Sequence, residues 1–69
     1  MTNVTARLRD ARFSQTYQGD RILIGKVYDD QYQRWLDGEE VATSIVVDEV
    51  EPNVFKTRAN TVFQVENWA

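Results

Sequence analysis

The sequence predicts an all-β domain, built as a small five-stranded antiparallel sheet that is strongly curled or closed into a partly open barrel. Five short runs with strand chemistry make up nearly all of the 69 residues, and residues that reverse a chain stand between them. The runs are 4–8, 21–28, 41–50, 54–57 and 61–65. A chain of this length allows one domain, residues 1–69, with a single small core.

The first two runs predict a bent strand beside a central one. Residues 4–8 alternate apolar and polar side chains, the period of two that marks a strand with one buried face. Ala11 and Phe13 fall on the opposite parity, so we expect a β-bulge near Arg9 and Asp10.

Both faces of residues 21–28 carry apolar side chains, which favours a central strand over an edge strand. Within this run Gly25 indicates a bend, or a point where another element crosses closely.

A long loop is expected at residues 29–40, where the alternation breaks down. One helical turn can form there, but the segment is too short for an independent helix. Asp37 and Gly38 are typical of a tight turn. We expect Trp35 and Leu36 to plug one end of the barrel.

The run that follows, residues 40–51, predicts one long strand whose core face switches near Val47 and Asp48. Pro52 and Asn53 then predict a turn, and residues 58–60 predict the last hairpin loop. A curled sheet of this size is SH3-like or OB-like.

Composition excludes several chemistries. The chain contains no Cys and no His, which removes disulfides, ordinary zinc sites, thiolate nucleophiles and the commonest general base. The acidic residues of 29–39 match no known metal loop, and a solvated turn is the ordinary interpretation. We therefore expect no enzyme activity, no metal and no cofactor. The first residues lack the pattern of a signal peptide and no apolar stretch approaches about 20 residues, so we expect a cytoplasmic protein without a membrane segment.

Charge is distributed unevenly along the chain, which has a net charge of −3. Residues 1–28 carry five basic and two acidic side chains, whereas residues 29–51 carry one basic and eight acidic side chains. Opposite charges on adjacent strands can pair and keep the domain in solution. Alternatively, residues 29–51 form an acidic face that steers a basic partner.

Three segments carry a resemblance to a known group of proteins: 25–28, 34–46 and 57–63. Their aromatic-x-Asp-Gly turn, which leads into a Thr-Ser strand and a Thr-Arg-Asn-Thr hairpin, resembles small uncharacterised all-β proteins of bacteriophages and prophages. The likeness covers about residues 21–65, and the chain departs from it by placing Ala59 between Arg58 and Asn60. The resemblance implies an accessory viral protein in the host cytoplasm, with no activity attached.

A docking surface is predicted from polar and aromatic residues. Arg34 and Arg58 could grip a carboxylate or phosphate beside Tyr28 and Trp35, because Arg and aromatic side chains are typical of interface centres. Thr43 could extend this patch, or be no more than a good strand former on a solvated face. The candidate binding residues are Tyr28, Arg34, Trp35, Asp37, Glu39, Glu40, Thr43 and Arg58.

The leading functional hypothesis is a non-enzymatic module that binds a host or viral protein through the acidic face, with strand-edge pairing as a second route. The alternative is a single-stranded nucleic-acid binder in which bases stack on aromatic rings. In that case the phosphates would follow Arg7, Arg9, Arg12, Lys56 and Arg58. Exposed sheet edges also make a homodimer possible.

Overall fold

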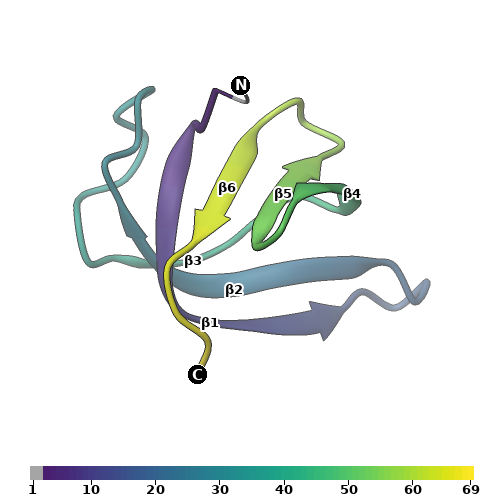
Figure 1. Cartoon of the computed structure of the whole chain (residues 1–69). Coiled ribbons are helices and arrows are strands. Elements are labelled where there is room, and N and C mark those ends of the chain that lie inside the picture. Colours follow the sequence, from purple (N-terminus) through teal and green to yellow (C-terminus); the bar gives the residue numbers. More distant parts are fainter. Residues whose placement is uncertain (1–2) are drawn as a thin grey trace.

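A computed structural model describes residues 3–69, and within them it contains six β-strands and no helix (Figure 1). The strands are β1 (Ala6–Gln15), β2 (Arg21–Tyr28), β3 (Glu40–Ala42), β4 (Val46–Glu51), β5 (Val54–Thr57) and β6 (Val62–Val65). The all-β prediction is therefore confirmed, while the prediction of five strands is wrong by one. In the described part of the chain, no helix has the length and apolar character to cross a bilayer.

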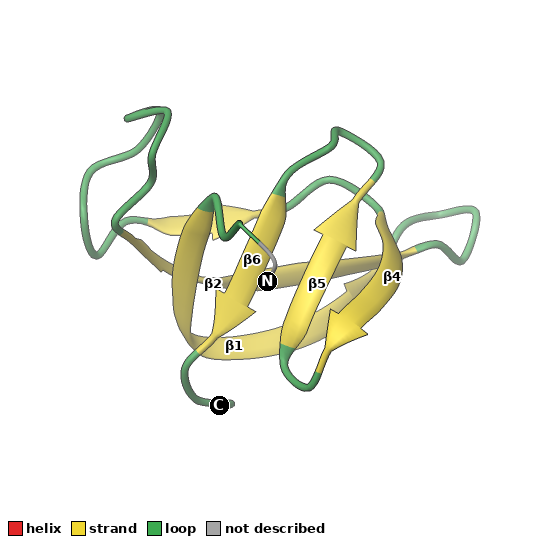
Figure 2. Cartoon of the chain, turned by 45° about the horizontal axis from the view of Figure 1, so that its top comes forward, coloured by secondary structure: helices red, strands yellow, loops and turns green. Residues whose placement is uncertain are grey.

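All strands belong to one sheet, in the order β3-β2-β1-β6-β5-β4. Every neighbouring pair is antiparallel except β1 and β6, which run parallel. The expectation of a wholly antiparallel sheet is thus wrong, because two antiparallel units, β1–β3 and β4–β6, meet along β1 and β6. The sheet does not close into a barrel, and β3 and β4 are its two edges (Figure 2).

The expected strand at 41–50 is divided into β3 and β4, and Thr43 explains the division. Its backbone N–H donates to the Leu23 carbonyl, and its Oγ1 accepts from the Leu23 N–H at 3.0 Å and donates to the Ser44 carbonyl. Side-chain bonds of this kind end a ladder because they replace backbone partners. The bend expected near Val47 and Asp48 is confirmed as a register shift in the pairing of β4 with β5.

The predicted bulge in β1 is confirmed. Its pairing with β2 shifts register between Arg9 and Arg12, and Asp10 has a positive φ of 52°. Gly25 lies against this bulge, where a Cβ would stand 3.1 Å from the Arg9 carbonyl oxygen and 3.2 Å from the Ala11 Cα. The strand continues beyond the bulge to Gln15, and Figure 1 shows β1 bending sharply along its course.

Residues 29–39 form an irregular loop of turns without a helix. Trp35 is partly buried and packs against the core, as expected of a plug. Leu36 does not, because its side chain is 79% exposed, so that half of the prediction is wrong.

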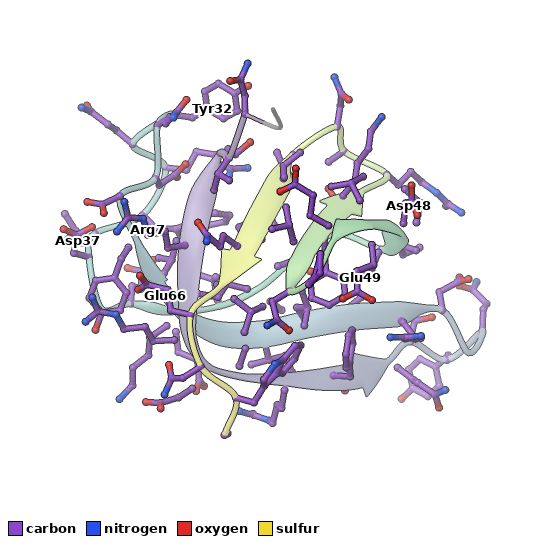
Figure 3. All side chains as sticks on the ribbon, in the orientation of Figure 1. Arg7, Tyr32, Asp37, Asp48, Glu49 and Glu66 are labelled. Atoms are coloured by element: carbon purple, nitrogen blue, oxygen red, sulfur yellow. The ribbon has the colours of Figure 1, made fainter. Side chains whose placement is uncertain are left out.

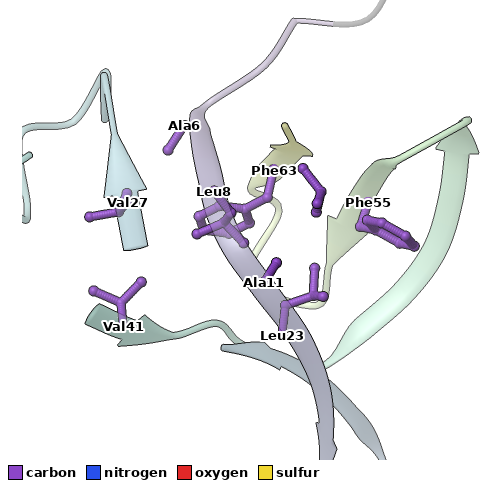
Figure 4. Packing of buried hydrophobic residues seen from close by; sticks show 9 residues of the cluster. Ala6, Leu8, Ala11, Leu23, Val27, Val41, Phe55 and Phe63 are labelled. Carbon is purple, nitrogen blue, oxygen red and sulfur yellow. The ribbon is translucent and has the colours of Figure 1, made fainter. Parts of the chain in front are cut away.

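The core lies on the concave side of the curled sheet (Figure 4). Phe63, Leu8, Leu23 and Val27 are its largest fully buried apolar side chains, and Phe55 closes it on the side of β4 and β5. The remaining members of the buried cluster are Ala6, Ala11, Val41 and Val65. A single small core leaves most of the charged side chains at the surface, where the candidate sites are found.

Candidate functional site

The outer face of β1 and β2 carries a row of cations that pair with carboxylates. The row consists of Arg7, Arg9, Arg12 and Lys26, and its partners are Asp10, Asp29, Glu40 and Glu66. The distances range from 2.7 Å for Arg9 with Glu66 to 3.8 Å for Arg12 with Glu40. Four cations thus face four carboxylates, so this outer row is balanced in charge.

The pair of Arg9 with Glu66 is the shortest of these ion pairs, and it shifts the pKa of both residues. The Arg9 Nε donates to the Glu66 carboxylate at 2.7 Å, and this hydrogen bond lowers the pKa of Glu66 and raises that of Arg9. The Arg9 guanidinium also lies 4.3 Å from the centre of the Tyr28 ring. Tyr28 therefore contacts Arg9, whereas the sequence predicted that Tyr28 lies beside Arg34.

Arg34 is held within its own loop. Its guanidinium pairs with the buried Asp30 carboxylate at 3.2 Å and stacks over the Trp35 ring at 4.2 Å. Burial by itself would raise the pKa of Asp30, but hydrogen bonds from Arg34 and from the Tyr32 backbone outweigh burial and lower it. Arg34 lies beside Trp35, but its cationic group already has a carboxylate partner.

The remaining residues of the predicted docking surface lie elsewhere. Arg58 belongs to the β5–β6 hairpin, on the other side of the molecule from the loop that holds Arg34 (Figure 1). Thr43 is buried and bonded to Leu23, so it supports the fold. Arg34 and Arg58 therefore do not form one anion grip.

The predicted acidic face is divided as well. Figure 3 shows Asp37 on one side of the molecule and Asp48 with Glu49 on the opposite side. Asp37 accepts a hydrogen bond from the Asp29 N–H, and Glu40 pairs with Arg12. Glu39 lies in the same turn as Asp37 and is exposed. The residues of 29–51 thus supply two separate acidic regions, one in the loop and one along β4.

Strand β4 is the more distinctive of the two regions. It pairs with β5 on one side, and its other side is an edge of the sheet. Two register shifts bend it, and Val47 and Val50 are 55% and 37% exposed. Asp48 and Glu49 lie between these valines. An exposed edge with apolar and acidic side chains is the strongest candidate for a contact surface in the described residues.

A cleft of about 290 Å³ lies along β4, which we call the β4 cleft. Its lining residues are Arg21, Val46, Val47, Asp48, Glu49 and Phe55. The wall opposite β4 comes from β2, where β3 pairs only with residues 24–26 and leaves Arg21 beyond the end of the β2–β3 ladder. The cleft therefore lies between β4 and the part of β2 that β3 does not cover.

Aromatic rings support the far wall of this cleft. The Phe13 ring is stacked on Trp68, with 5.2 Å between centroids, and Phe55 meets both rings edge to face. The Arg21 guanidinium lies 4.2 Å from the centre of the Phe13 ring. Arg21 also lines a second cleft, of about 450 Å³, together with Phe13, Ser14 and Gln15. Arg21 thus lines both clefts, and its guanidinium lies against the Phe13 ring.

Sequence reasoning missed Arg21, Phe13, Trp68 and Val47 as members of a site. One signal was available for Val47, because it stands directly before Asp48 and Glu49 in a strand made of three valines and three acidic residues. No signal joined Phe13 to Trp68, because 55 positions separate them and the parallel pairing of β1 with β6 brings them together.

The acidic side chains of the described residues lie apart from one another or pair with cations. Among residues 3–69, no group of three or more acidic side chains is placed to hold a metal ion. Asp30, the most buried carboxylate, is occupied by Arg34.

Comparison with known proteins yields no matching family model, no matching curated protein and no matching solved structure.

Proposed function

We propose that the chain is a small non-enzymatic protein-binding module that holds a basic partner against the acidic edge formed by β4. The observation that carries the proposal is the combination found on β4: an edge of the sheet, exposed valines, and carboxylates beside a cleft. Interface centres combine apolar and aromatic surface in this way, and charges around them select the partner.

The distribution of ion pairs favours β4 over five of the other acidic residues. Asp10, Asp29, Asp30, Glu40 and Glu66 are each paired with a cation at 4.0 Å or less. Asp48 and Glu49 belong to none of these pairs. Carboxylates that are not already paired within a protein contribute most to the attraction of a basic partner.

The test compares two charge reversals of equal size. Immobilised wild type, Asp48→Lys and Glu39→Lys are exposed to a bacterial lysate, and retained proteins are quantified by mass spectrometry. We expect one or more basic proteins to be retained by wild type and by Glu39→Lys, and to be lost with Asp48→Lys. Retention of the same proteins by all three would contradict the proposal.

A single-stranded nucleic-acid binder is the second candidate, and the Phe13–Trp68 stack beside Arg21 favours it, since bases stack on exposed rings. Against it, the cations expected to follow the phosphates, Arg7, Arg9 and Arg12, lie next to carboxylates. A titration of fluorescent single strands at low salt separates the candidates. We expect no binding, and salt-sensitive binding with quenched Trp fluorescence would favour the second candidate.

We also propose that the fold is a small SH3-like or OB-like barrel left open between β3 and β4. The bulge in β1 and the close approach at Gly25 support this, because such devices bend sheets into barrels. The resemblance of residues 21–65 to phage-encoded proteins supports a role as a viral accessory protein in the host cytoplasm. Its partner would be a host or viral protein.

A further inference from the structure

We propose that the partner binds by adding a β-strand to the free edge of β4, and that the added segment alternates basic with apolar side chains. This inference rests on the proposed function and deepens it, because it names the binding mode and the chemistry of the partner. The apolar side chains of the segment would enter the β4 cleft.

Strand addition is favoured first because β4 is an edge strand of the sheet. The strand has six residues, and β5 is its only strand partner in the described part of the chain. Within the described residues, 46–50 make no backbone hydrogen bond outside the ladder with β5. Their outer backbone groups can therefore pair with a new strand, and main-chain hydrogen bonds of this kind provide the affinity in strand addition. β3 offers a poorer edge because it has only three residues.

The side chains of β4 select the occupant. Three of its six residues are acidic and none is basic. Side chains directly opposite each other on paired strands are about 5 Å apart, so opposite charges stabilise the pair and like charges destabilise it. A second copy of this chain would place carboxylates of one β4 next to those of the other. A segment rich in Lys or Arg has the complementary charge.

The β4 cleft indicates why the added segment should alternate basic with apolar side chains. Successive side chains of an added strand point to opposite faces, so every second one would point into the cleft. Val46, Val47 and Phe55 give the cleft apolar surface, Asp48 and Glu49 line it as well, and Arg21 forms the opposite wall. The Arg21 guanidinium repels a cation at that wall, so the apolar side chains of the added strand lie toward Arg21 and Phe55, and its basic side chains lie beside Asp48 and Glu49.

The experiment uses the full chain labelled with ¹⁵N and three capped hexapeptides. The first alternates Lys and Val, the second is the first with Pro in place of its middle Val, and the third is the first with Glu in place of every Lys. We expect the first peptide alone to shift the amide signals of residues 46–51 and to slow their hydrogen exchange by about tenfold or more. Asp48→Lys should abolish this effect and Glu39→Lys should retain it.

Each of the remaining outcomes contradicts one part of the inference. Equal binding of the Pro-containing peptide means that charge acts without strand pairing, which rejects strand addition and leaves the proposed function standing. Equal binding of the Glu peptide rejects the basic segment. Protection of residues 46–51 that rises with protein concentration alone identifies a second copy as the occupant. Absence of any protection by the Lys-Val peptide rejects the inference as a whole.

Discussion

The Asp30 carboxylate is almost fully buried, with 1% of its side chain exposed, and the Arg34 guanidinium lies 3.2 Å from it at the surface. The same carboxylate accepts hydrogen bonds from the backbone N–H groups of Tyr32 and Arg34 at 3.2 and 2.9 Å. Asp30 therefore holds the loop closed at several points, and the loop carries Trp35 against the core. The low pKa of Asp30 follows from these bonds, which outweigh its burial.

Replacing Asp30 with Asn should lower the free energy of unfolding by about 2 kcal/mol at neutral pH, because the amide has no charge for Arg34 and presents one donor where acceptors are needed. Denaturant titration measures the change. Asp29→Asn is the matched control, since Asp29 is exposed and makes one ion pair at 3.6 Å. An equal loss in both variants would contradict a special role for Asp30.

The stabilising effect of Asp30 should also depend on pH. Its pKa in the folded protein lies below the unfolded value of about 3.8, so its contribution is present above that value and is lost as the pH falls through the folded pKa. The gap in unfolding free energy between wild type and Asp30→Asn should therefore narrow as the pH falls below about 4. A gap that stays constant down to pH 2 would show that the Asp30 charge is not its source.

Thr43→Val should destabilise the fold by about 1–3 kcal/mol, because the buried Leu23 N–H loses the oxygen that lies 3.0 Å away. Thermal unfolding is the measurement. Ser44→Ala provides the control, since Ser44 is exposed and contributes its backbone carbonyl to this site. If binding of a partner were lost without any change in stability, Thr43 would belong to a contact surface after all.

Gly25→Ala should cost about 1–3 kcal/mol, because the added methyl would press on backbone atoms of Arg9 and Ala11 that cannot turn away. The bulge in β1 would have to shift. Denaturant unfolding should show the loss, while Gln64→Ala, an exposed substitution in β6, should leave the stability nearly unchanged. A neutral Gly25→Ala variant would show that β1 and β2 can move apart at this point.

Trp68→Ala should lower the unfolding free energy by about 1–2 kcal/mol, which corresponds to a fall in Tm of several degrees for a domain of this size. The variant loses the stack on Phe13 and the hydrogen bond from the indole N–H to Asn53 at 3.2 Å. Tyr17→Ala is expected to leave Tm unchanged, because Tyr17 is fully exposed. Equal Tm values for wild type and Trp68→Ala would contradict the stabilising role of the stack.

The sequence predicted features that depend on local pattern. The parity change between Leu8 and Ala11 indicated the bulge, and Gly25 indicated a close approach, because alternation and glycine act over a few residues. Residues 40–51 gave one strand in prediction and two in the structure. The break depends on the bond between Thr43 and Leu23, which lie 20 positions apart, and local pattern does not reveal such a bond.

The candidate site was less predictable than the fold. Closeness along the sequence suggested that Asp37, Glu39 and Glu40 form one surface with the acids of β4. The chain crosses from one edge of the sheet to the other between Ala42 and Val46, and this crossing separates them. A run of acidic residues in the sequence shows where the charges stand along the chain. Only the order of the strands in the sheet shows which of these charges lie on the same face.

The parallel contact of β1 with β6 has a consequence for the kinetics of folding. Residues near position 7 must meet residues near position 64 before the two halves of the sheet can join. Contacts so distant in sequence carry a large loop-closure entropy and slow the search for the native topology. During synthesis, β1 to β3 emerge from the ribosome long before their neighbour exists, so the sheet can be completed only after residue 65 has been released.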